Sequence, residues 1–174
     1  MSNSLTTDSD TQDYGIQFWG LKCNPKIKVL LWKMSHNGLP TMERLHSRLP
    51  QIAATYPRCS LQVESTFHCF FSCSHSIGVW QKLGHHLVPM NLQSQQPWRW
   101  LDHALQQILS NSRSPQLITH FVFTLWSIWL ARNLHVFEGK QLLVEEILSR
   151  AGNLAIEFST ASTLFLSSLS FSSS

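Results

Sequence analysis

The sequence predicts a mainly α-helical protein, and three observations lead to that prediction. Apolar residues recur at helical spacing, and helix-capping residues precede several of these stretches. In no segment do apolar and polar residues alternate long enough to indicate a strand. The chain has 174 residues, 43% of them hydrophobic, which suffices for the core of one domain. We expect a small helical domain with a zinc-knuckle-like Cys/His loop, a disordered N-terminus and a Ser-rich C-terminal tail.

A pair of helices is predicted within residues 25–50. Asn24 can cap the first helix, and Asn37-Gly38 can end it with a left-handed residue. The apolar face of this helix contains Ile27, Leu30, Leu31 and Met34. Thr41 can cap the second helix, in which the apolar face is expected to continue to Leu49.

Three more helices are predicted in the second half of the chain. A short amphipathic helix is expected over residues 98–109, after a loop over 84–97. Residues 116–134 contain an apolar run of about fifteen residues, shorter than the roughly 20 that a membrane span needs, so we expect a buried helix. The last helix, residues 141–158, has an apolar stripe of Leu143, Ile147, Leu148, Ala151, Leu154, Ala155 and Phe158. The remaining residues, 159–174, form a low-complexity Ser tail to which we assign no structure.

Positive charge is concentrated in one segment of the N-terminal half of the chain. The net charge is +3, but residues 20–60 hold seven basic residues against one acid and carry +6. Such a segment can attract nucleic-acid phosphates, or it can simply be the solvated outside of two helices. The candidate phosphate contacts are Lys26, Lys28, Lys33, Arg44 and Arg48.

The sequence contains no recognisable catalytic constellation. The seven glycines form no phosphate-binding loop, and no GxSxG motif is present. Only ten acidic residues occur, and the one adjacent pair, Glu145-Glu146, is expected on a solvated helix face. We therefore expect a protein that is not an enzyme.

Three of the four cysteines lie in the segment "CSLQVESTFHCFFSC", residues 59–73. The polar, acidic start of the chain has no apolar leader, so we expect an intracellular, reducing environment. In such an environment, clustered cysteines indicate a metal site or side chains buried in the core. Zinc needs four nitrogen or sulfur ligands, and Cys59, His68 and Cys73 can supply three. The short helix expected after Cys73 has Ile77, Val79, Trp80 and Leu83 as its apolar residues.

The fourth ligand of this candidate zinc site is the open question. In a C-x2-C-x5-H-x4-C pattern the second cysteine would stand at position 62, where the chain has Gln62. A neutral amide is a poor zinc ligand beside thiolates. Cys69 and His75 are alternatives, and the cysteines can instead pack as small hydrophobic residues without any metal.

Three blocks in this order resemble a known family, over about residues 18–140. The first block has a Trp, then P-K-x-K and then L-P-T, in "FWGLKCNPKIKVLLWKMSHNGLPTMERLHSR". The second block has the Cys/His pattern, in "CSLQVESTFHCFFSCSHSIGVWQKL". The third block has W-x-I-W-x-x-R-N-x-x-x-F, in "LWSIWLARNLHVFEGK". The matching positions are Trp19, Pro25, Lys26, Lys28, Trp32, Leu39, Pro40, Thr41, Leu45, Cys59, Thr66, His68, Phe70, Cys73, Trp80, Trp126, Ile128, Trp129, Arg132, Asn133 and Phe137. Together they resemble the zinc-binding domain that follows the reverse transcriptase in plant LINE-type, non-LTR retrotransposons.

The resemblance implies a division of the chain and a function. It implies a zinc-binding-like domain over 18–90 and a helical connector over 91–158. Composition alone predicts the disordered N-terminus over 1–17 and the low-complexity tail over 159–174. A module of this family would bind zinc and help a reverse transcriptase hold RNA or single-stranded DNA, and its parent element would work on nuclear DNA. We expect no membrane partner, because the longest apolar run is too short for a span.

Two positions depart from the family pattern. Gln62 replaces a ligand and Ser60 replaces the usual proline. Because one ligand of four is lost, we expect weak or no zinc retention. The alternative hypothesis is a degenerate structural or protein-interaction remnant that binds neither zinc nor nucleic acid.

Overall fold

The structure is a computed structural model that describes residues 19–84, 101, 104–106 and 115–171. Its described part is mainly helical, which confirms the predicted fold class. The elements are α2 (Pro25–Ser35), α3 (Met42–Arg48), the π-helical turn η1 (His68–Ser72), α4 (Ser74–Leu83), α6 (Pro115–Glu138) and α7 (Val144–Phe171). Within the described ranges the one strand-like pairing outside a named strand is an isolated antiparallel bridge between Thr55 and Val63.

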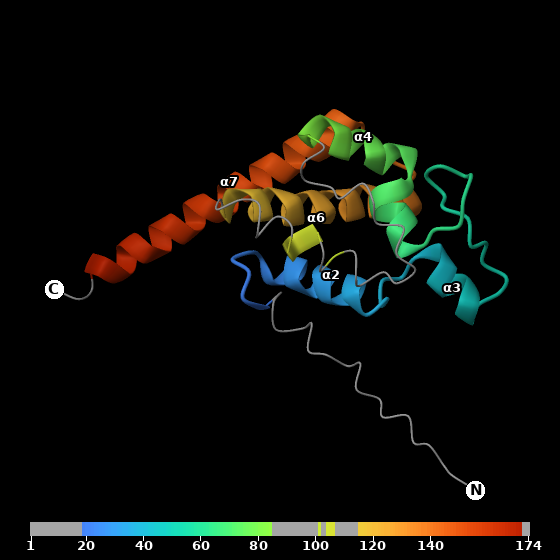
Figure 1. The fold of residues 1–174 in the computed structure, drawn as a ribbon, viewed down its shortest axis with the longest axis horizontal. Helices are drawn as coiled ribbons and strands as arrows, with labels where there is room; N and C mark the ends of the chain where they lie inside the picture. The colour runs from blue at the N-terminus through green and yellow to red at the C-terminus, as the bar shows by residue number, and fades with distance from the viewer. Residues whose placement is uncertain (1–18, 85–100, 102–103, 107–114, 172–174) are drawn as a thin grey trace, which may run out of the picture.

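Helix α6 is the central element around which the others pack (Figure 1). It contacts α2 on one side and α7 on another, and it also contacts η1. Helix α4 packs against both η1 and α7. Helix α7 crosses α6 and projects beyond the rest of the fold toward the C-terminus (Figure 1).

The first helix forms as its sequence predicts. The Asn24 side chain accepts a hydrogen bond from the Lys26 backbone N–H at 3.0 Å, which satisfies one of the free N–H groups at the helix start. Asn37 adopts a left-handed conformation with φ of 47° just after the helix. The predicted apolar residues are all buried: Ile27, Leu30, Leu31 and Met34.

Helix α3 is capped as predicted but packs less deeply than expected. The Thr41 side chain accepts a hydrogen bond from the Arg44 N–H at 3.4 Å. None of the residues of α3 itself is buried. Leu49, expected on the apolar face, lies after the helix end and is 45% exposed, so that expectation was wrong.

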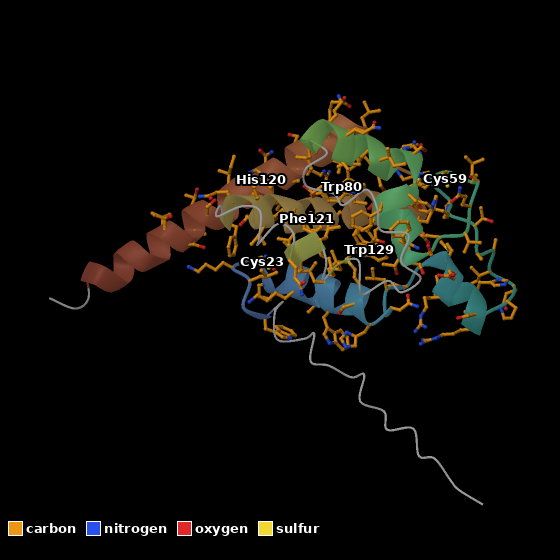
Figure 2. The ribbon with its side chains drawn as sticks, in the orientation of Figure 1. Cys23, Cys59, Trp80, His120, Phe121 and Trp129 are labelled. Atoms are coloured by element: carbon orange, nitrogen blue, oxygen red, sulfur yellow. The ribbon has the colours of Figure 1, made fainter. Side chains whose placement is uncertain are left out.

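Helices α6 and α7 supply much of the core. On α6 the buried apolar side chains are Phe121, Val122, Phe123, Leu125, Ile128, Trp129 and Ala131. Aromatic rings join this helix to its neighbours: the ring centroids of Phe70 and Trp129 are 6.0 Å apart, and those of Trp80 and Phe121 are 5.4 Å apart. Figure 2 shows Trp80, Phe121 and Trp129 gathered along α6.

The expected last helix differs from the structure at both ends. It begins at Val144, and Leu143 just before it is exposed while Leu142 is buried in its place. It extends to Phe171, through the Ser-rich stretch to which the sequence assigned no structure. The predicted disordered N-terminus, the loop over 84–97 apart from Gly84, and most of the helix over 98–109 lie outside the described residues.

The described helices include none with both the length and the apolar content that a bilayer crossing requires. The apolar run in α6 is instead part of the core, as its length predicted.

Candidate metal centre

The structure brings Cys59, His68 and Cys73 together at one place. Their candidate ligand atoms, two thiol sulfurs and one imidazole nitrogen, all lie within 4.8 Å of one another. The Cys59 Sγ is 3.3 Å from the His68 Nε2. Zinc–sulfur and zinc–nitrogen bonds of roughly 2.3 and 2.0 Å can be made from atoms at such spacings, so the donor set fits a zinc ion.

The π-helical turn η1 explains why His68 and Cys73 lie side by side. The Cys73 backbone N–H donates a hydrogen bond to the His68 carbonyl five residues earlier, at 2.9 Å. In an α-helix, side chains five residues apart point to different sides of the helix. In a π turn, with its wider i→i+5 hydrogen-bonded ring, they lie on nearly the same side. Single π turns of this kind often occur at functional sites.

The His68 ring is held in the orientation that a metal ligand needs. Its Nδ1 lies 3.0 Å from the Ser72 Oγ, which leaves Nε2 facing Cys59. Burial lowers the pKa of His68, while the nearby charge of Glu64 opposes that change. The neutral imidazole is therefore favoured, and it is the neutral form that binds metal.

Cys73 is buried, and its thiol group therefore keeps its proton more strongly than an exposed thiol does. Burial raises the pKa of Cys73, partly offset by a hydrogen bond from the His75 backbone, and the neighbouring Cys59 raises it further. A metal that binds here must displace that proton, so metal affinity will depend on pH.

The alternative fourth ligands are committed to other contacts. Cys69 is fully buried and its Sγ lies 3.8 Å from the Tyr56 hydroxyl, so it packs as a core residue. The His75 ring is half-buried; burial lowers its pKa, and the nearby Arg58 cation lowers it further. Among the described residues, no fourth His, Cys, Asp or Glu joins the three ligands. Cys23 is also buried, in the α2 region and apart from Cys59 (Figure 2).

A buried ion pair anchors the loop between Cys59 and His68. Glu64 accepts two hydrogen bonds from Arg132 of α6, from Nε and Nη2, each at 2.7 Å. The same carboxylate accepts a hydrogen bond from the Met42 N–H at 2.6 Å, at the start of α3. Glu64 therefore ties the ligand loop to α3 and α6 at once.

Sequence reasoning did not identify Glu64. One signal for it was available: a single acid stands in a segment of Cys, His and apolar residues, in a chain with few acids. Arg132 was noted only as part of the third resembling block, and the pairing of the two residues is a tertiary contact that no local pattern encodes.

The five candidate phosphate contacts lie on α2 and α3. Lys26, Lys33 and Arg48 are exposed, and Lys28 and Arg44 are half-buried. The Lys28 Nζ donates a hydrogen bond to the Trp19 carbonyl at 2.7 Å, which ties the preceding chain to α2. Trp32, also on α2, is 42% exposed and stacks on His36 with ring centroids 4.8 Å apart.

Residues 1–80 match the family model described as zinc-binding in reverse transcriptase. No curated protein and no solved structure matches the chain. The matched range contains all three candidate ligands and both helices that carry the candidate phosphate contacts. Residues 1–80, just under half of the chain, are therefore similar to the zinc-binding domain of reverse transcriptases.

Proposed function

We propose that this chain is a non-enzymatic module that binds one zinc ion through Cys59, His68 and Cys73 and binds single-stranded RNA or DNA beside it. The observation that carries the proposal is the convergence of three ligand atoms within 4.8 Å inside the matched domain. The order of the three sequence blocks supports an origin in a plant LINE-type, non-LTR retrotransposon.

The zinc ion would have a structural role, because such an ion links separate chain segments and contributes to folding stability. Cys59 belongs to a loop, while His68 and Cys73 belong to the π turn that packs against α4 and α6. Metal binding would therefore fix the loop to the core. Through Glu64, the same loop is connected to the start of α3.

The nucleic-acid surface that we propose consists of the outer faces of α2 and α3. Lys26 and Lys33 border an apolar groove of about 820 Å³ between α2, α3 and α6. Exposed lysines can neutralise phosphates, and an exposed aromatic ring such as Trp32 can stack on a base. A basic surface with an aromatic ring among its charges is typical of proteins that hold single strands without reading their sequence.

The proposal is tested by two measurements on the full chain. Titration of the purified protein with Zn²⁺, followed by metal analysis after unbound metal is removed, is expected to saturate at one zinc per chain. Fluorescence anisotropy with a single-stranded RNA at two salt concentrations is expected to show binding that weakens steeply with salt.

The variant Lys26→Glu/Lys33→Glu should reduce RNA binding at least tenfold. Its matched control is Arg150→Glu, which changes an exposed cation on α7 and should leave RNA binding unchanged. If neither zinc nor RNA binds at low salt, the chain is the structural remnant of the alternative hypothesis.

A further inference from the structure

We propose that the acidic N-terminal segment of this chain, residues 8–18, docks into the apolar groove between α2, α3 and α6 and competes there with nucleic acid. The competition rests on the proposed nucleic-acid binding, because it concerns the same surface. Three observations support the docking: the lining and charge of the groove, the composition of the segment, and the place where the described chain begins.

The groove has an apolar lining, part of which is exposed. Its volume is about 820 Å³. Among the residues that line it, Leu30, Leu39 and Trp129 are buried, whereas Val29 and Phe137 are 42% and 78% exposed. An apolar groove of this size with exposed walls is typical of a surface that another segment or molecule covers.

The edge of the groove that α2 forms is positively charged. Lys26 and Lys33 line the groove, and both are exposed. They are seven residues apart, about two helical turns, so they lie on the same side of α2 about 10 Å apart along its axis. A third lining cation, Arg132, is already paired with Glu64. Since none of the described lining residues is acidic, the groove favours an occupant with both negative charge and apolar side chains.

The N-terminal segment "DSDTQDYGIQF", residues 8–18, has this composition. It has three acidic residues and no basic residue, a charge of −3 that complements the +6 of residues 20–60. It also has three aromatic or large apolar residues. The residues of the two kinds are Asp8, Asp10 and Asp13, and Tyr14, Ile16 and Phe18. The segment lies outside the described residues, so its match to the groove is one of composition.

The segment is attached close enough to reach the whole groove. The described chain begins at Trp19, whose carbonyl accepts a hydrogen bond from the Lys28 Nζ of α2 at 2.7 Å. The eleven residues of α2 span about 16 Å, whereas eleven residues of extended chain reach up to about 36 Å. Because the attachment keeps the segment at a high effective concentration beside the groove, even weak contacts suffice for docking.

Docking would regulate nucleic-acid binding through shared lysines. Lys26 and Lys33 are also the proposed phosphate contacts, so a phosphate backbone and the acidic segment cannot both neutralise them. The apparent affinity for RNA then falls in proportion to the fraction of time for which the groove is open.

Docking is tested by carbodiimide cross-linking of the full chain, followed by mass spectrometry. The reagent joins a carboxylate to an amine that it contacts, without a spacer. We expect a link from Asp8, Asp10 or Asp13 to Lys33, at the end of α2 away from Trp19, within the monomer. The variant Ile16→Ser/Phe18→Ser keeps every charge and removes apolar contacts, so this link should be lost. Its matched control, Leu5→Ser, changes an apolar residue outside the segment and should keep the link.

Competition is tested with the same three proteins by fluorescence anisotropy with single-stranded RNA. Ile16→Ser/Phe18→Ser should bind RNA at least about threefold more tightly, the gain expected where the groove is open for about a third of the time. Because this variant does not alter the charge, a general electrostatic effect cannot explain the gain. Leu5→Ser should bind RNA like the unaltered chain.

Three results would overturn the inference. They are the absence of the Lys33 link, a link that persists in Ile16→Ser/Phe18→Ser, and a link confined to cross-linked dimers, which would make a second copy the occupant. Equal RNA affinity of that variant and the unaltered chain would overturn the competition. If the link depends on the two apolar residues but no protein binds RNA, the docking is supported and the proposed nucleic-acid binding is wrong.

Discussion

Arg132 of α6 donates two hydrogen bonds to Glu64, and both side chains are buried. Burial alone would lower the pKa of Arg132, but the hydrogen bonds and charge of Glu64 outweigh it and raise that pKa. The guanidinium also donates to the Pro40 carbonyl at 3.1 Å and lies 4.9 Å from the centre of the Trp129 ring. One ion pair thus joins the ligand loop, the start of α3 and the central helix, across 68 positions of the chain.

The first prediction concerns this ion pair. Glu64→Gln leaves the Arg132 cation buried without its counter-charge, and breaking a buried pair in this way costs about 3–5 kcal/mol of unfolding free energy. Urea denaturation followed by circular dichroism would measure the loss. The control is Glu145→Gln, which removes the exposed partner of Lys82 and should leave the denaturation midpoint unchanged.

A double variant separates the charge effect from a general packing effect. Glu64→Met/Arg132→Met removes both buried charges and should be more stable than Glu64→Gln alone, because no unpaired charge remains. If the double variant were the less stable of the two, the ion pair would not be the source of the loss.

The helices and the three candidate metal ligands could be predicted from short stretches of the sequence. Caps such as Asn24 and periodic apolar residues such as Ile27 and Leu31 act within a few residues, and the structure has them as predicted. The pairing of Glu64 with Arg132 was not accessible, because it joins segments 68 positions apart. The π turn at His68 was not predicted either, because its sequence does not distinguish it from an α-helical turn. The continuation of α7 to Phe171 was missed because serine favours caps and turns over helix interiors, so a Ser-rich stretch does not predict a helix.

The second prediction concerns the orientation of the His68 ring. Ser72→Ala removes the hydroxyl group next to Nδ1, so the ring loses the contact that holds Nε2 toward Cys59 in the candidate metal centre. Loss of such a partner typically lowers metal affinity 10–100-fold. Competition with a coloured zinc chelator would measure the change.

The control for this measurement is Ser74→Ala, an exposed serine at the start of α4. It should bind zinc as tightly as the unaltered chain. Equal affinity of Ser72→Ala and the unaltered chain would show that the hydroxyl has no part in holding the ligand.

The third prediction is a pH dependence of the metal-free protein. Burial lowers the pKa of His68, so the fold favours its neutral form and should lose stability as the pH falls below about 6.5, the ordinary value for histidine. Burial raises the pKa of Cys73, so the fold favours the thiol and should lose stability as the pH rises above about 8.5. Thermal denaturation between pH 5 and 9, roughly the range these values define, should show a maximum near neutrality.

Zinc should change this profile on its alkaline side. Bound metal holds the cysteines as thiolates, so the loss of stability at high pH should disappear when zinc is present. At low pH the ligands are protonated and zinc should be released, so the two profiles should converge there. Profiles that coincide throughout the range would contradict zinc binding at this site.

The last prediction concerns Trp32 as a stacking group. Trp32→Ala should weaken binding of single-stranded RNA by about 1–3 kcal/mol, because stacking of a base on an aromatic ring contributes about that much. The slope of affinity against salt should stay the same, since no cation is removed. Lys33→Ala should do the opposite and reduce that slope.

Leu143→Ala, which alters an exposed apolar residue just before α7, is the matched control and should bind RNA like the unaltered chain. If Trp32→Ala changes only the salt slope, or changes nothing, RNA does not stack on this face of α2.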